Sequence, residues 1–280
     1  MKPNTITGAV LAASLLLGAV ASGSVYAIAD LVVDRGLPII NLNNAAGIAR
    51  SNISWTGFEA QWFTGDTFYM PETRAGQPWT IDTIRIWSPA MLVSESQLKD
   101  HYSSISLYAD LYDATGVTPF TQRSQGNIIS GNQSDNSSIT FTKVTYADAS
   151  NSDYQSSGGQ VYQLWQVDFT NLNWVVSPSQ WIQFGVDATG PDMWYTHASN
   201  AALSGSTQQD ADGAFTYIDR TNLLTMFDCD SAPGSGTSAF CSWNKSSDLN
   251  VQVFATPAPG SLALALIGLF GLSAARRGRA

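Results

Sequence analysis

Two cysteines carry the most specific covalent chemistry that the sequence offers. Cys229 and Cys241 are the only cysteines, and they flank the segment 230–240, which is rich in Ser, Gly and Ala. In an oxidising compartment such a pair forms a disulfide, and closing a loop of this length restricts the unfolded chain by about 3 kcal/mol in the entropic description. We therefore expect a Cys229–Cys241 disulfide, with metal ligation or a reactive thiol as the alternative.

Catalytic side chains lack a local motif. His101 and His197 are the only histidines, and the sequence has neither a Gly-x-Ser-x-Gly elbow nor an HExxH pair. Glycoside hydrolysis needs two carboxyl groups that face one another across a cleft. Glu59, Glu72 and many aspartates are present, but no motif pairs them. We expect a protein that is not an enzyme, with a secreted glycoside hydrolase as the weaker alternative.

One acidic segment has the spacing of a calcium-loop start. Asp210 and Asp212 are followed by Gly213, but no third oxygen ligand follows in register and no glutamate closes the loop. Solvated turn carboxylates are the simpler interpretation. We expect no cofactor, and a structural Ca²⁺ bound by Asp210 and Asp212 is a weak alternative.

Aromatic residues are abundant, at 11% of the chain. Exposed aromatic faces stack on sugar rings, whereas buried ones fill the core of a large β domain. Four aromatic residues fall on the polar faces of their expected strands, and we name them the candidate glycan platform. They are Trp87, Tyr108, Tyr112 and Trp181.

The elements that must position these residues are strands, because apolar and polar residues alternate through the middle of the chain. The clearest case is 104–113, where Ile105 and Leu107 face one way and Tyr108 the other. Further strands are expected in 61–69, 83–87, 139–144, 161–169, 181–186, 193–197, 215–218, 223–227 and 249–254. One-sided alternation indicates sheets that pack on one face and meet water on the other. It predicts an all-β antiparallel β-sandwich of jelly-roll type.

Three segments between the strands read differently. The region 92–101 could form one short helix, because Glu95 and Lys99 lie four residues apart. The stretches 122–138 and 146–159 are rich in Ser, Asn, Gln and Gly, and we expect them to be polar connections.

The N-terminus has the features of a secretion signal. Lys2 precedes an apolar run from Ile6 to Ala21, and a polar stretch then ends in Val25-Tyr26-Ala27. Compact residues at the last and third-last positions suit signal peptidase, so we expect residues 1–27 to be removed after Ala27. An uncleaved membrane anchor is the alternative.

The C-terminus combines a proline motif, an apolar run and a basic cluster. The 15 residues from Ser261 to Ala275 contain no charge. As a helix they would reach about 22 Å, so they could cross a hydrocarbon core of about 30 Å by local thinning and arginine snorkelling. The basic residues that follow should stay on the cytoplasmic side. They are Arg276, Arg277 and Arg279.

This tail, 256–280, resembles the PEP-CTERM sorting signal of Gram-negative bacteria. Pro257, Pro259 and Gly260 match the motif, whereas Ala258 stands where the family usually has Glu. The resemblance implies processing by an exosortase-type enzyme and an association with exopolysaccharide. In addition, 79–84 (Trp-Thr-Ile-Asp-Thr-Ile) resembles a strand-opening phrase of sandwich proteins that carry such tails.

Charge narrows the choice of partners. All 22 acidic residues lie between Asp30 and Asp248, whereas four of the 13 basic residues are terminal, so the middle has 22 acidic against 9 basic residues, a net charge of −13. Such a domain is repelled by nucleic acid. We therefore expect a β-sandwich over 28–255 that is exported, anchored in transit at the inner membrane, and then displayed at the cell surface or released. A carbohydrate-binding module is the alternative, with extracellular polysaccharide as its partner.

Overall fold

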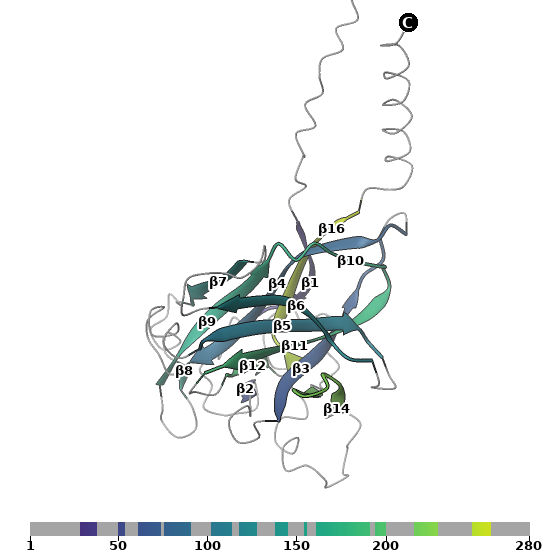
Figure 1. Cartoon of the computed structure of the whole chain (residues 1–280). Helices are drawn as coiled ribbons and strands as arrows, with labels where there is room; N and C mark the ends of the chain where they lie inside the picture. The colour runs from purple at the N-terminus through teal and green to yellow at the C-terminus, as the bar shows by residue number, and fades with distance from the viewer. Residues whose placement is uncertain are drawn as a thin grey trace, which may run out of the picture.

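The computed structural model (Figure 1) describes residues 29–37, 50–53, 61–73, 76–90, 102–113, 118–127, 138–144, 154–155, 161–190, 194–199, 216–228 and 248–258. Within these ranges the fold is all-β, as the alternation predicts, with sixteen strands and no helix. The strands are β1 Asp30–Arg35, β2 Arg50–Ile53, β3 Trp62–Met70, β4 Trp79–Ala90, β5 Ser104–Leu111, β6 Thr121–Asn127, β7 Ser138–Lys143, β8 Tyr154–Gln155, β9 Val161–Thr170, β10 Trp174–Val176, β11 Gln180–Thr189, β12 Thr196–Ser199, β13 Thr216–Asp219, β14 Thr225–Asp228, β15 Asp248–Leu249 and β16 Val251–Pro257.

These strands form three sheets in which every pair is antiparallel. The seven-stranded sheet has the order β1-β16-β4-β9-β7, with β10 paired to β4 and β8 paired to β9. The six-stranded sheet has the order β14-β13-β3-β11-β5-β6, and the three-stranded sheet has the order β15-β12-β2. Most neighbours in a sheet are far apart in sequence, so the register depends on long-range packing.

The two larger sheets share one hydrophobic core. Alternate residues of β4 and β9, such as Ile84 and Phe169, enter it from the seven-stranded sheet. Phe68 and Phe184 enter from the six-stranded sheet, with ring centroids 5.6 Å apart. The inward face expected for 104–113 is confirmed for Ile105, Leu107 and Ala109, which are fully buried, whereas Leu111 is exposed where β5 ends.

Some strands arise where the sequence shows no alternation. The expected polar connection from residue 122 onwards is wrong at its start, because β6 occupies Thr121–Asn127 and pairs with β5. Likewise, β8 lies inside the expected connection 146–159. β6 has no apolar face, and pairing with β5 places it, whereas β8 is a two-residue strand that pairs with β9. The expected helix 92–101 lies outside the described residues.

A tight turn sets β10 beside β4. Asn171 and Asn173 have φ of 59° and 48°, the left-handed region that Asn tolerates better than most residues. β10 then carries Trp174 to the edge of the core, where the Arg123 guanidinium of β6 lies 4.1 Å from its ring centroid. This contact joins one sheet to the other, because β6 and β10 belong to different sheets.

The first and last described strands lie side by side. Asp30 of β1 is opposite Ala255 of β16, and in Figure 1 the purple start of β1 and the yellow end of β16 both lie at the top of the coloured body. The first and last described strands are therefore neighbours.

Candidate functional site

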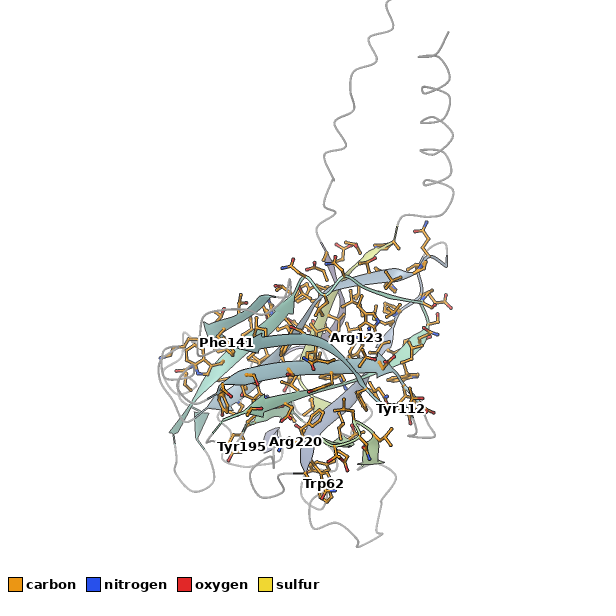
Figure 2. The ribbon with its side chains drawn as sticks, viewed as in Figure 1. Trp62, Tyr112, Arg123, Phe141, Tyr195 and Arg220 are labelled. Atoms are coloured by element: carbon orange, nitrogen blue, oxygen red, sulfur yellow. The ribbon has the colours of Figure 1, made fainter. Side chains whose placement is uncertain are left out.

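An aromatic cluster lies on the outward face of the six-stranded sheet. The register sets Trp181 of β11 opposite Tyr69 of β3, and their ring centroids are 5.4 Å apart at 56°. The Tyr112 amide donates to the Trp181 carbonyl at 2.9 Å, which brings the end of β5 beside them. Trp181 is 39% exposed and Tyr112 41%. Figure 2 shows Tyr112 at the edge of the body, on the side opposite Phe141 in this view.

Polar side chains follow the cluster along the same face. Gln183 of β11 lies opposite both Thr67 of β3 and Asp110 of β5. Asp110 accepts hydrogen bonds from the Thr121 hydroxyl and lies 3.4 Å from the Arg123 guanidinium. Gln183 is only 3% exposed, so the partly exposed Asp110 carboxylate is the polar group that a ligand on the aromatic pair could reach. Apolar stacking beside a hydrogen-bond acceptor provides the two kinds of contact that orient a polar ring-shaped ligand.

Tyr108, the next aromatic residue on this face, is partly covered. It packs against Phe63 at a centroid distance of 5.3 Å, beside a small cluster that contains Phe120 and Ile218. Burial is the main cause that raises the pKa of Tyr108 above its ordinary value. The sequence places Tyr108 on the correct face, but Tyr108 packs in a cluster with Phe120 and Leu223, which lie in two different loops. It is therefore a poor stacking surface.

Two glycines make room for that covering layer. Gly65 and Gly185 lie opposite one another in β3 and β11. A Cβ on Gly185 would lie 2.5 Å from the Ile218 side chain and 2.9 Å from that of Phe63. The absence of side chains at both positions lets the covering residues rest directly on the backbone.

An ion pair fastens the turn after β13 onto the same sheet. The Arg220 guanidinium donates two hydrogen bonds to the Asp187 carboxylate of β11, at 2.6 and 2.8 Å. Leu223 in this turn has φ of 58° and accepts from the Phe120 amide at 2.8 Å. Figure 2 labels Arg220 in this turn. The cluster beside the turn covers Tyr108 on the outward face, whereas Trp181 and Tyr112 stay exposed.

The structure corrects the expectation for Trp87. It does face away from the central core, but it is only 5% exposed because Leu164, Leu37 and Val144 pack around it on the outer side of the seven-stranded sheet. It also belongs to a different sheet from Trp181. Of the four predicted platform residues, Tyr112 and Trp181 are exposed and adjacent, Tyr108 is partly covered, and Trp87 is excluded. The half-buried Tyr69, which the alternation analysis did not select, packs against Trp181.

A buried ionic group is a second concentration of functional side chains. Arg35 of β1 lies 3.4 Å from Asp66 of β3 and 3.3 Å from Asp248 of β15, and all three side chains are almost completely buried. The Arg35 guanidinium also donates to the Thr67 carbonyl at 2.5 Å, and Asp66 accepts from the Leu249 amide at 2.7 Å. These contacts tie one strand from each sheet together.

His197 of β12 belongs to the same buried region. Its Nδ1 lies 2.6 Å from Asn250 Oδ1, and the Asn250 amide group donates to the carbonyls of Arg35 and Gly36. His197 is fully buried. It lies within β12, as expected for a strand residue, and its contacts connect β12 to β1 through Asn250.

The C-terminal motif begins inside the fold. Pro257 is the last residue of β16 and pairs with Trp79, and the Ala258 amide donates to the Pro78 carbonyl at 2.7 Å. The other predicted site residues lie outside the described residues. These are Ala27, Pro259, Gly260, Arg276, Arg277, Arg279, Cys229, Cys241, Asp210 and Asp212.

Comparisons with known proteins add no assignment: the chain matches no family model, no curated protein and no solved structure. Within the described ranges, no group of three or more His, Cys, Asp or Glu side chains could hold a metal ion. No helix in the described part of the chain is long and apolar enough to cross a membrane.

Proposed function

We propose that this chain is an exported, non-enzymatic protein whose C-terminal tail anchors the β body at the inner membrane in transit. It is then displayed at the cell surface or released, where it associates with exopolysaccharide. Signal peptidase would remove residues 1–27, and an exosortase-type enzyme would act on 256–280. The supporting observation is the position of the first and last described strands. The first described strand starts at Asp30, three residues after Ala27, and the last ends at Pro257, within the motif.

For the body we propose a jelly-roll β-sandwich. The order β1-β16-β4-β9 in one sheet and β3-β11-β5-β6 in the other supports it. Followed along the chain, these eight strands change sheet at every step except the β5–β6 hairpin, as expected when a long antiparallel hairpin is rolled into two facing sheets. The remaining strands extend the edges of this arrangement or lie in the small third sheet.

Cell fractionation of the full chain tests the tethering. Expressed in a Gram-negative host without an exosortase, it should begin at Ile28, resist alkaline carbonate extraction and be digested by protease added to spheroplasts. A variant that ends at Ser261 should be released in soluble form. Co-expression of an exosortase should shorten the membrane-bound chain. Intact full-length chain in the cytosol with both thiols reduced would contradict the proposal.

Glycan binding is the second candidate, because the exposed Trp181 and Tyr112 lie beside the half-buried Tyr69 and near the partly exposed Asp110 carboxylate. The test is retention of the full chain on the purified polysaccharide of the producing organism. Trp181→Ala should abolish retention, whereas Val175→Ala, another exposed apolar residue, should not. Equal retention of the two variants would remove this group as the binding site.

A further inference from the structure

Exposed apolar side chains gather at one end of the body. Among the described residues, the large hydrophobic side chains that are exposed come from four different strands or their ends, and we name them the apolar rim. They are Leu31 (43% exposed), Leu111 (43%), Tyr112 (41%), Val175 (59%) and Trp181 (39%). Single exposed hydrophobic residues are ordinary on a protein surface, so their grouping is the informative feature.

The strand register shows that these positions share one end. Val175 of β10 lies opposite Thr80 of β4, which lies opposite Thr256 near the end of β16. Leu31 lies opposite Phe254 on the other side of β16. On the second sheet, the Ser179 amide donates to the Met70 carbonyl where β11 begins. Trp181 follows two residues later.

Among the described residues, exposed polar side chains lie toward the opposite end of the sheets. β11 begins next to Trp181 and finishes at Thr189, which is exposed, and β7 finishes at Lys143, also exposed. Thr189 lies eight residue steps after Trp181, a span of about 26 Å in an extended strand. The apolar rim therefore belongs to one end and not to the whole surface.

The chain leaves the body from the rim's end. Three residues stand between Ala258 and Leu262, the first residue of the apolar run 262–275. Four extended steps cover at most about 14 Å. If that run lies in a bilayer, as the proposed function requires, the end of β16 must lie within this distance of the hydrocarbon core, in or next to the headgroup layer.

We propose that the apolar rim lies in the headgroup layer of the membrane that holds the tail, so that the body stands in a fixed orientation with Thr189 and Lys143 farthest from the lipid. This inference rests on the proposed tethering. Trp and Tyr favour the membrane–water interface because one side of each ring system is apolar and the other polar. Leu31, Leu111 and Val175 add apolar area.

Charge identifies the lipid chemistry. Asp30 at the start of β1 and Glu72 after the end of β3 are exposed at this same end. Carboxylates are repelled by anionic lipids but not by zwitterionic ones. The partner is therefore a zwitterionic phospholipid surface. The rim's weak intrinsic attraction is sufficient because the tail already keeps the body next to the bilayer.

The test uses full-length chain reconstituted in phosphatidylcholine vesicles that contain a nitroxide-headgroup lipid. A fluorescent amino acid replaces Val175 in one sample and Thr189 in another, which leaves both cysteines unchanged. Quenching at position 175 should exceed quenching at position 189 by about threefold or more. The double variant Leu31→Ser/Leu111→Ser should reduce quenching at 175 at least twofold, because both side chains are exposed and contribute to the rim, whereas Thr142→Ser should not change it.

Each outcome decides the inference. If alkaline carbonate extracts the reconstituted chain, the tethering itself has failed. If the chain stays anchored but positions 175 and 189 are quenched equally, the body is tethered without contact and the rim proposal is wrong. If quenching is equal and purified polysaccharide shifts the fluorescence at position 175, the rim is a glycan surface instead. Lipid quenching that polysaccharide does not relieve supports the membrane assignment.

Discussion

Arg35 is held entirely by groups from other strands: the carboxylates of Asp66 and Asp248 and the carbonyl of Thr67. Replacing Arg35 with Met keeps most of the side-chain volume but leaves two carboxylates buried without their cation. We expect a loss of about 3–5 kcal/mol in the free energy of unfolding, the usual cost of breaking a buried ionic group from one side. Urea denaturation followed by tryptophan fluorescence measures it.

A matched control is Arg85→Met. Arg85 pairs with Asp168 at 2.7 Å, but both side chains are partly exposed, and Asp168 also accepts from Gln166. Because water can replace the lost contact, we expect Arg85→Met to lower the free energy of unfolding by about 1 kcal/mol or less. Equal losses of stability in the two variants would show that burial does not make the Arg35 group more costly to break than the Arg85 pair.

Asp219 makes the stability of the body sensitive to acid. The amides of Thr221 and Asn222 and the Gln61 side chain donate to its carboxylate, and the Thr221 amide is the main cause that lowers its pKa. The pKa of Asp219 is lower in the folded than in the unfolded protein. Its carboxylate therefore contributes fully to the free energy of unfolding above the ordinary pKa of about 3.9, and this contribution is lost as pH falls through the folded value.

The variant Asp219→Asn should therefore be less stable than the parent at pH 6 and should approach it at pH 3. Urea midpoints at the two pH values measure the difference. A constant gap between the two proteins across this range would show that the carboxylate does not titrate below its usual pKa.

Alternation along a strand predicts which face of the sheet a side chain occupies, but not whether another segment covers that side chain. Alternation correctly placed Tyr108, Trp87 and Trp181 on outward faces, yet only Trp181 is exposed. Whether a second layer covers an outward side chain depends on segments distant in sequence, such as Phe120 over one sheet and Leu37 over the other. No period within a strand carries that information.

At the scale of strands, Gly65 and Gly185 set how closely the Ile218 side chain of β13 packs on β3 and β11. A Cβ on Gly65 would collide with the Phe184 carbonyl oxygen and lie 2.5 Å from the Ile218 side chain. The carbonyl is held in the sheet and cannot move aside. Gly65→Ala should therefore lower the free energy of unfolding by about 1–3 kcal/mol, because the added methyl group overpacks this site.

Thermal or urea unfolding measures this loss. The companion Gly65→Ala/Ile218→Val removes the colliding Cδ1 and should recover only part of the stability, because the backbone contact remains. Full recovery would assign the strain to Ile218 alone, and an unchanged stability in Gly65→Ala would contradict the close approach.

The β6–β10 contact closes one edge of the body. Arg123 lies over Trp174, donates to the Ala109 carbonyl at 2.9 Å and has a pKa lowered mainly by burial. Arg123→Gln should lower the free energy of unfolding by about 1–2 kcal/mol, because a partly desolvated cation–π contact and a hydrogen bond are lost. A double-mutant cycle with Trp174→Leu should give a coupling near 1 kcal/mol. Additive losses would mean that the two residues act independently.

The same contact explains why β6 escaped prediction. Its residues Thr121–Asn127 show no apolar face, so local pattern reads it as a connection. Pairing with β5 and the position of Arg123 make it a strand. Strong alternation sufficed for β5, β9 and β11, which lie in the interiors of their sheets and pack on the shared core.

At the scale of the whole molecule, one core shared by two sheets predicts cooperative unfolding. The buried residues of β3, β5 and β11 contact those of β4, β9 and β16 in a single cluster. Fluorescence, near-ultraviolet and far-ultraviolet circular dichroism should therefore report one coincident urea transition for the full chain. Separate transitions would show that the sheets can unfold independently.

The adjacency of the two ends also belongs to this scale. β1 and β16 are separated by more than two hundred residues but are hydrogen-bonded neighbours. A protein whose ends meet can be processed at both without disturbing the rest of its fold, which is consistent with the proposed export and tethering.

The sequence alone determined that the middle of the chain forms antiparallel sheets with one apolar face, because alternation is a local property of each strand. It also predicts a secretion signal at one end and a sorting tail at the other. The tertiary structure decided which outward aromatics stay open, where Arg35 finds two buried carboxylates, and that Leu31, Val175 and Trp181 share one end. These depend on register and packing between strands distant in sequence, and local composition does not encode those pairings in readable form.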